Sequence, residues 1–498
     1  MNLLKKLAGE TAIYGISSIL GRMLNYLLVP LYTTVFLDSE YGVVTQLYAY
    51  VAFFNIVYTY GMETAFFRFA TKGNLLKTYQ LAASTMLLTS TLLSGLILFN
   101  AQSIAQYVGQ EDQAYLIQFL GIILFIDAVA AIPFARLRLE NRALTFALTK
   151  LGAILLTILL NLLFLLVPYM VLKLGSWLWL EPLVHQFYRS EFGVGYVFLA
   201  NLLGNALILI MLRRYFWQIG PLFSWEKIKP MLAYGIPIFL MGLAGIANEQ
   251  ADKLMIPAFL PEGFYPGKSS MAALGIYGAS FKLSIFMLLA IQAFRYAGEP
   301  FFFSQAKNRE APELFAKVLY YFVIVCTFIW VAVSLNLELL GNMFLRQAAF
   351  REALYLVPVL LLGKLLFGVY VNLSVWFKLV DKTIVGTYIS LIGAAITVSV
   401  NFVLIPVMGY TGSAIASVLC YGSMAAICYF WGKPHFPVPY RWTGIFIYLA
   451  ISLALIYGIP LIQSQNIMFN NLLNLVIPVL YVGVVYYVEK RNLYAKTT

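Results

Sequence analysis

The chain has 498 residues, of which 62% are hydrophobic and only 11% are charged. A soluble globular protein carries roughly 25% charged residues, so this chain could not cover its apolar surface in water. With 3 cysteines and apolar residues throughout, the sequence also excludes the disordered, collagen-like and disulfide-rich classes. The composition therefore predicts an all-α polytopic membrane protein.

Fourteen apolar runs are long enough to cross a bilayer as helices, which takes about 20 residues each. The longest connector covers residues 173–195 and leaves no room for a soluble domain. The predicted spans cover residues 11–36, 43–67, 81–100, 116–134, 151–172, 193–212, 231–257, 274–301, 318–337, 354–377, 384–405, 412–431, 444–462 and 472–488.

Most of the 33 basic residues fall in segments that share one side of the membrane with the N-terminus. The opposite segments carry only Lys173, Arg189, Lys268, Arg346 and Arg351. Because basic residues collect in cytoplasmic loops, both termini are predicted to be cytoplasmic. The same distribution explains the net charge of +12 without nucleic acid as a partner.

The chain repeats itself weakly, with corresponding motifs six spans apart. Tyr14-Gly15-Ile16 in the first span returns as Tyr234-Gly235-Ile236 in the seventh. The second span ends with Tyr60-Gly61-Met62-Glu63, and the eighth ends with Tyr296-Ala297-Gly298-Glu299. The repeat predicts two six-helix bundles, residues 1–220 and 221–432, related by a pseudo-twofold axis. Residues 433–498 then form two additional helices and a cytoplasmic tail.

Ten ionisable residues lie within the predicted spans, although a charged group at the centre of a membrane helix costs roughly 2.5–3.5 kcal/mol. The bases are Arg22, Lys253, Lys282, Arg295 and Lys364, and the acids are Glu63, Asp127, Glu249, Asp252 and Glu299. The deepest four are Arg22, Asp127, Lys282 and Lys364. Asp252 and Lys253 lie nearer an outer end, where we expect side chains to snorkel to water.

Separated cations inside a membrane protein are typical of a cavity that binds an anionic group, and Arg in particular suits phosphate. The alternative is that some of these charges are buried ion pairs that lock helices together. Arg295 with Glu299, and Glu249 with Lys253, have the i,i+4 spacing of such pairs. Both interpretations stay open for these two pairs.

Polar side chains recur at helical spacing beside the charges and predict the lining of a polar cavity. They are Tyr14, Ser18, Asn25, Asn55, Thr59 and Gln292. Lys282 and Arg295 are 13 residues apart, which is about 220° around an ideal helix. A straight span cannot point both inward, so either the eighth span is bent or one of the two has another role.

The sequence holds two His residues and no His/Cys/Asp cluster, so we expect no metal site and no cofactor. Cys326, Cys420 and Cys428 lie inside apolar runs and are predicted to be small core residues. No Ser/His/Asp arrangement is present, although membrane polymerases also carry few motifs. Two like bundles around a central cavity are typical of a transporter, so we expect a transporter with no catalytic residues. A membrane glycan polymerase or ligase stays open, with residues 173–195 as the one outer segment large enough to serve it.

Three stretches resemble the polysaccharide flippases, the Wzx-type branch of the multidrug/oligosaccharidyl-lipid/polysaccharide exporter (MOP) superfamily. They are Asn401–Ser417 at the junction of spans 11 and 12, Pro133–Arg142 at the end of span 4, and Gly275–Lys282 at the start of span 8. The resemblance covers about residues 8–431 and implies a MATE-like fold. Spans 13 and 14 match that family only in number.

The resemblance implies an alternating-access flippase of the bacterial cytoplasmic (inner) membrane. Such proteins pass undecaprenyl-pyrophosphate-linked oligosaccharide to the outer leaflet for O-antigen, capsule or exopolysaccharide synthesis. Arg22, Lys282, Arg295 and Lys364 would then meet the pyrophosphate, and spans 13 and 14 would add a groove for the lipid tail. The implied partners are this lipid-linked substrate, membrane lipid, a polysaccharide polymerase and glycosyltransferases.

Coupling to H⁺ or Na⁺ would then run through Asp127, Glu63 or Asp252, and nothing in the sequence selects the ion. Glu249 and Glu299 are the remaining ion-coupling or ion-pair candidates. Two relatives in the same superfamily are alternatives. A peptidoglycan lipid-precursor flippase is the nearer one, and a cation-coupled multidrug exporter predicts acids rather than bases deepest in the cavity.

Overall fold

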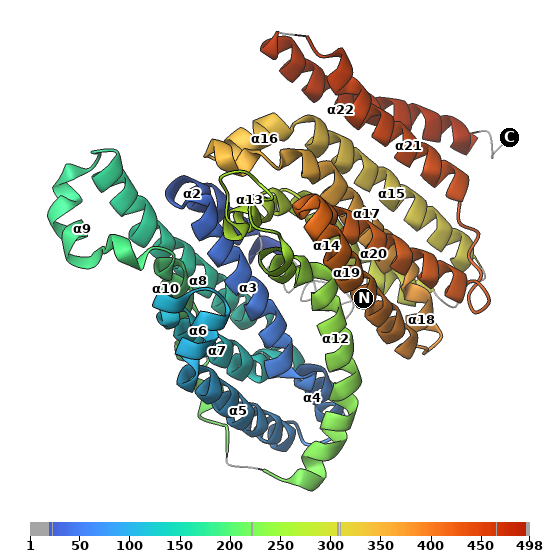
Figure 1. Ribbon diagram of the computed structural model, residues 1–498. Helices are drawn as coiled ribbons and strands as arrows, with labels where there is room; N and C mark the ends of the chain where they lie inside the picture. Colours follow the sequence, from blue (N-terminus) through green and yellow to red (C-terminus); the bar gives the residue numbers. More distant parts are fainter. Residues whose placement is uncertain are drawn as a thin grey trace. The chain divides into compact units, whose positions relative to one another are not determined.

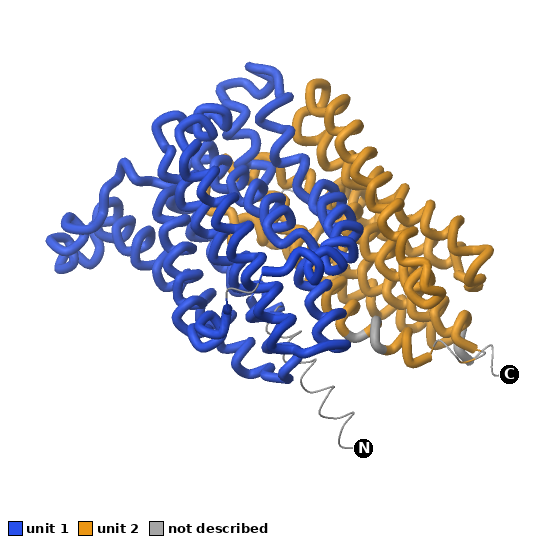
Figure 2. Tube along the Cα trace, turned by 90° about the horizontal axis from the view of Figure 1, so that it is seen from below, with its two compact units in different colours: residues 1–278 blue, residues 279–498 orange. Residues whose placement is uncertain are grey.

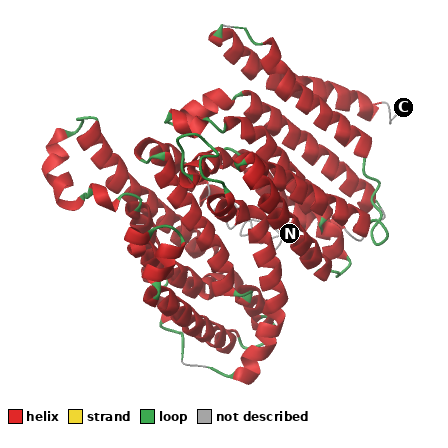
Figure 3. Cartoon of the chain, viewed as in Figure 1, coloured by secondary structure: helices red, strands yellow, loops and turns green. Residues whose placement is uncertain are grey.

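The computed structural model describes residues 19–21, 23–220, 223–305, 308, 310–464 and 466–494. These residues form helices joined by loops and turns, with no strand among them (Figure 3). The predicted all-α class is confirmed. Within the same ranges, 11 helices are long and apolar enough to cross a membrane, or up to 12 if a bent pair counts as one span.

The predicted count of fourteen spans is not confirmed. Most of the first predicted span lies outside the described residues, and the sixth coincides with a helix of only 17 residues, Gly195–Met211. At 1.5 Å per residue that helix extends about 25 Å, which is shorter than a hydrocarbon core of about 30 Å. Helices lie at the positions of the other predicted spans.

The chain divides into two compact units, residues 1–278 and 279–498, coloured separately in Figure 2. The predicted division at residues 220 and 432 follows the internal repeat and remains a prediction. The helices of unit 1, shown in Figure 1, are α2 (Leu28–Val35), α3 (Asp38–Thr59), α4 (Met62–Ala70), α5 (Leu75–Phe99), α6 (Ala101–Tyr107), α7 (Ala114–Leu139), α8 (Ala143–Asn161), α9 (Glu181–Phe187), α10 (Gly195–Met211), α11 (Arg213–Phe216), α12 (Trp225–Phe259) and most of α13 (Ser270–Lys282).

In unit 1, α7 is the central helix and packs against α3, α5, α8 and α10. Small residues allow this close packing, since Ala128, Ala130 and Ala135 of α7 are fully buried. Without a hydrophobic driving force in lipid, close van der Waals contact through small residues is what holds membrane helices together.

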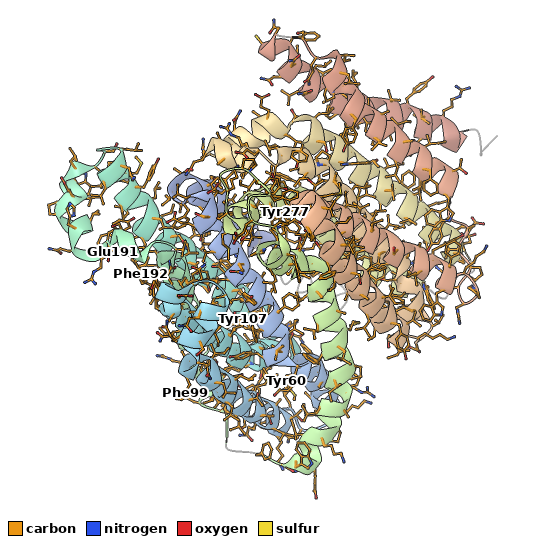
Figure 4. All side chains as sticks on the ribbon, in the orientation of Figure 1. Tyr60, Phe99, Tyr107, Glu191, Phe192 and Tyr277 are labelled. Carbon is orange, nitrogen blue, oxygen red and sulfur yellow. The ribbon has the colours of Figure 1, made fainter. Side chains whose placement is uncertain are left out.

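The chain breaks between α3 and α4 at Tyr60 and Gly61, and Tyr60 is labelled in Figure 4. Both residues have left-handed backbone conformations, with φ values of 32° and 76°. Close packing also requires glycine at position 61, because a Cβ there would collide with the carbonyl of Gly235 in α12. At the other end of α3, Gly42 meets α13 just as closely, at Met271 and Gly275.

The helices of unit 2 are α14 (Ile285–Gln305), α15 (Ala311–Leu335), α16 (Leu337–Phe344), α17 (Val357–Leu373), α18 (Val375–Leu379), α19 (Ile384–Met408), α20 (Tyr410–Gly432), α21 (Trp442–Gly458) and α22 (Ile467–Tyr494). Its centre is the packing of α20 against α17 and α19. The last two helices dock on α15 through polar contacts, since buried Glu489 of α22 accepts hydrogen bonds from Tyr320 and Tyr448 at 2.8 Å each.

Candidate functional site

Two of the predicted cations flank a bend in the eighth span. The span is broken into α13 and α14, whose axes differ by 47°. Lys282 is the last residue of α13, Arg295 lies in the middle of α14, and both side chains are exposed. The bend is the first of the two alternatives that the 13-residue spacing allowed. Gln292, one turn before Arg295, is half-buried.

Lys364 has a different environment from those two cations. It is only 3% exposed, in α17 inside unit 2. Its Nζ lies 4.8 Å from the ring centroid of Phe281 and 5.8 Å from that of Tyr421. An ammonium over the faces of aromatic rings is stabilised by the ring quadrupole. The structure therefore buries Lys364 against aromatic rings, while Lys282 and Arg295 are exposed.

Several predicted residues cannot be compared with the structure. Arg22, Tyr14, Ser18 and the side chain of Glu299 lie outside the described residues. The Arg295–Glu299 ion pair consequently stays a prediction. Asn25, the remaining polar neighbour of Arg22, is exposed.

Asp127 of α7 lies in a polar network within unit 1. Its Oδ1 accepts a hydrogen bond from Nδ2 of Asn205 in α10 at 2.8 Å. One turn earlier on α10, Nδ2 of Asn201 donates to the hydroxyl of Tyr48 in α3 at 2.9 Å. Lys150 of α8 is the cation whose charge acts on this carboxylate. The half-buried acid is thus held by a neutral amide among hydroxyl and amide side chains.

The predicted site residues did not include Asn201 or Asn205. They also did not include the buried Tyr32 and Asn161, whose side chains form a hydrogen bond of 2.9 Å. The available signal was the i,i+4 spacing of two asparagines in an otherwise apolar helix. Such a pair places two amides on one face, and in lipid an amide needs a partner.

Asp252 and Lys253 of α12 form a compact buried pair. Lys253 Nζ lies 3.2 Å from Oδ1 of Asp252 and donates to the backbone carbonyl of Glu249 at 3.0 Å. The hydroxyl of Tyr277, labelled in Figure 4, donates to Oδ2 of Asp252 at 2.5 Å. The expected relief by snorkelling is wrong, because the two side chains are only 7% and 5% exposed. The carboxylate has an ammonium and a hydroxyl beside it instead.

Glu63 is paired rather than isolated. Its carboxylate forms a salt bridge with Arg138 at the end of α7, and both side chains are about one-third exposed. The nearby predicted lining residues Asn55 and Thr59 are half-buried, and the Thr59 hydroxyl donates to the Asn55 carbonyl at 2.8 Å. At the same end of unit 1, burial and a hydrogen bond to Glu140 raise the pKa of Tyr215.

Within the described ranges, no group of three or more His, Cys, Asp or Glu side chains is arranged to hold a metal ion. Cys326, Cys420 and Cys428 are buried free thiols, as expected of core residues.

The fold resembles that of solved MOP-superfamily transporters. The lipid II flippase MurJ in its inward closed conformation superimposes with a TM-score of 0.72 at 14% identity, covering 97% of this chain and 100% of MurJ. An inward-facing multidrug resistance MATE family transporter gives 0.59 at 14% identity, with 86% and 96% covered. A multidrug resistance MATE family transporter in an outward-facing conformation gives 0.53 at 15% identity, with 89% and 97% covered.

At the sequence level, residues 36–197 match the family model of polysaccharide biosynthesis proteins, Polysacc_synt_3. The chain matches no curated protein sequence. The matched segment holds α3 to α9 and the start of α10, including Glu63 and Asp127, whereas Asn201 and Asn205 lie beyond its end. The chain therefore has the MATE-like fold that its sequence predicts, and residues 36–197 confirm its resemblance to the polysaccharide biosynthesis family of this superfamily.

Proposed function

We propose that this protein is a flippase that carries undecaprenyl-pyrophosphate-linked oligosaccharide across the bacterial cytoplasmic membrane by alternating access. The observation that carries the proposal is the pair of exposed cations, Lys282 and Arg295, on either side of the bent eighth span. An exposed charge within a membrane helix requires a polar environment. Two cations separated by a bend suit a diphosphate, which Arg binds bidentately and Lys binds as a point charge.

The transported lipid would enter from the cytoplasmic leaflet, with both termini of the protein in the cytoplasm, and leave from the outer leaflet. Glycosyltransferases would supply it and a polysaccharide polymerase would consume it, with O-antigen, capsule or exopolysaccharide as the end product. The exposed apolar side chains of α22, such as Leu472 and Val479, support a groove for the lipid tail.

Ion coupling is best supported at Asp127. Glu63 is neutralised by Arg138, and Asp252 is neutralised by Lys253 and further held by Tyr277. Asp127 is held by the neutral Asn205 amide, so a proton or Na⁺ can be exchanged without breaking a contact ion pair. We infer that H⁺ or Na⁺ binding at Asp127 drives transport.

The test of the substrate is a deletion strain that is complemented with the wild-type protein or with Arg295→Ala and Lys282→Ala variants. We expect the deletion to abolish surface polysaccharide, with lipid-linked oligosaccharide accumulating on the cytoplasmic side. Each variant should reproduce the defect at normal membrane levels. Lys382→Ala, at an exposed position in the turn between α18 and α19, is the matched control and should restore polysaccharide. Wild-type polysaccharide in both cavity variants would contradict the assignment.

A peptidoglycan lipid-precursor flippase is the second candidate, favoured by the TM-score of 0.72 with the lipid II flippase MurJ. In that case the gene should be essential, and the protein should support growth of cells depleted of their own lipid II flippase. A multidrug exporter predicts instead restored drug resistance in a sensitive strain, with no polysaccharide defect on deletion.

A further inference from the structure

The connection between α8 and α10 is a folded hairpin that extends from unit 1 (Figure 1). Its rising arm continues the α8 helix through two π-helical turns, Leu162–Leu166 and Tyr169–Lys173, so that one helix runs from Ala143 to Lys173. Its descending arm contains α9. The π turns widen the helix around Pro168, where a change of direction is easiest.

The hairpin is a built element with its own packing. Val171 and Val184 are buried between its arms. At its base, the Tyr196 hydroxyl accepts a hydrogen bond from the Arg189 backbone N–H at 2.7 Å and donates to the Phe187 carbonyl at 3.2 Å. Tyr196 also stacks on Tyr188, with ring centroids 5.3 Å apart. The base is labelled at Glu191 and Phe192 in Figure 4.

The outer surface of this hairpin is unusually apolar. Six large apolar side chains are exposed within twelve residues: Leu172, Leu174, Trp177, Leu178, Trp179 and Leu183. Trp179 alone is 79% exposed. Two of its exposed polar side chains, Glu181 and His185, lie one helical turn apart and approach each other to 3.7 Å.

The loop between α12 and α13, on the same predicted side of the membrane, provides a contrast. Its aromatic residues Phe264 and Tyr265 are half-buried, and its exposed positions are proline, glycine, glutamate and serine. That is the composition expected of a loop in water. Since the two connectors belong to the same unit, the apolar surface is a property of the hairpin and not of outer loops in general.

The apolar surface of the hairpin is continuous with the lipid-facing side of α8. Exposed leucines follow one face of the continuous helix Ala143–Lys173, namely Leu144, Leu148, Leu155, Leu159 and Leu163. The face continues through the half-buried Leu166 and Met170 to exposed Leu174. Residues spaced three or four apart share one face of a helix, so the same face that meets lipid in the span extends into the hairpin.

The length of the uncharged stretch gives the position of the hairpin relative to the bilayer. No charged residue lies between Lys150 and Lys173, and these 22 residues extend about 33 Å as a helix. The hydrocarbon core is about 30 Å thick. Trp177 and Trp179 follow Lys173 by four and six residues, which is where the headgroup region is expected, and tryptophan is enriched there in membrane proteins.

We propose that the tip of the hairpin, residues 172–183, is a membrane-interface anchor that inserts Trp177, Leu178 and Trp179 among the headgroups of the outer leaflet. Its partner is a lipid surface. The anchor fixes the outer end of α8, next to α10, which by itself is shorter than the hydrocarbon core. The proposal is independent of the transported substrate.

The test measures the depth of a nitroxide label at the tip. Ser176→Cys places the label beside the tryptophans without removing an apolar residue, and the three native cysteines are buried. Glu262→Cys, in the loop between α12 and α13, is the matched control. In vesicles of phosphatidylethanolamine and phosphatidylglycerol, we expect collisions with oxygen to exceed those with a water-soluble nickel complex several-fold at Ser176. For the label at position 262, collisions with the nickel complex should exceed those with oxygen.

Equal exposure of the two labels to the nickel complex would overturn the proposal, because the hairpin would then project into water. Protection at Ser176 that appears only when a second protein is added would also overturn it, in favour of a protein-docking surface. Trp177→Ser combined with Trp179→Ser should move the Ser176 label toward water, whereas the conservative Phe replacements should leave its depth nearly unchanged. Retention of the membrane depth in the double Ser variant would contradict the anchoring role of the tryptophans.

Discussion

Asp127 and Asp252 are both acids within membrane helices of unit 1, yet they have opposite surroundings. Asp252 has an ammonium 3.2 Å from one oxygen and a tyrosine hydroxyl 2.5 Å from the other. Asp127 accepts a hydrogen bond from the amide of Asn205 at 2.8 Å, and Lys150 acts on it from a neighbouring helix. Asp252 has its counter-ion in contact on its own helix, whereas the contact of Asp127 is a neutral amide and its nearest cation acts from another helix.

The different partners of the two acids suit different roles, one in stabilising the fold and one in transport. A buried acid with a bound counter-charge stabilises the fold only while the pair is intact, because removing one partner leaves an uncompensated charge. An acid held by neutral dipoles can gain or lose a small cation with little rearrangement. We therefore propose a structural role for Asp252 and an ion-exchanging role for Asp127, which three predictions test.

The largest effect is expected at Asp127. Asp127→Asn keeps the shape and the contact with Asn205 but removes the exchangeable charge, so surface polysaccharide should fall to the level of the deletion strain. The protein should still be present in the membrane in wild-type amounts, as measured by immunoblotting. Full polysaccharide synthesis with Asn at this position would show that Asp127 is not the coupling site.

Breaking the other pair should affect stability instead. Lys253→Met leaves the Asp252 carboxylate buried without its counter-ion, which costs about 3–5 kcal/mol when one partner of a buried pair is lost. Membrane levels should drop sharply, together with the thermal stability of the detergent-solubilised protein. The double variant Asp252→Asn with Lys253→Met removes both charges and should recover most of the level. If the double variant reaches normal membrane levels but does not transport, the Asp252–Lys253 pair has a direct role in transport.

The smallest effect is expected at Tyr277. Tyr277→Phe removes one hydrogen bond to a charged acceptor, worth about 1.5–3 kcal/mol, while the ion pair with Lys253 remains. We expect a lower unfolding temperature and transport close to wild type. Tyr321→Phe, at an exposed tyrosine, is the control and should leave the unfolding temperature unchanged. A transport defect in Tyr277→Phe without loss of stability would contradict the purely structural role of Asp252.

Prediction from sequence succeeded where hydrophobic periodicity and charge were sufficient. The apolar runs gave the all-α class and the approximate helix positions, because each span must satisfy its own backbone hydrogen bonds in lipid. The 13-residue spacing of Lys282 and Arg295 required either a bend or two roles, and the structure has the bend. The expectation that Asp252 and Lys253 reach water was wrong, since their helix face is covered by α13 through Tyr277.

The sequence by itself determined the membrane class and the helical fold of this protein, and it identified the ionisable residues that the membrane should have excluded. Only the tertiary structure decided which of them are compensated. Asn205 is 78 residues from Asp127, and Tyr277 is 25 residues from Asp252. Helical periodicity gives the face on which a charge lies, but its partner comes from whichever helix packs against that face, and this packing is set by the close fit of distant residues such as Gly61 and Gly235.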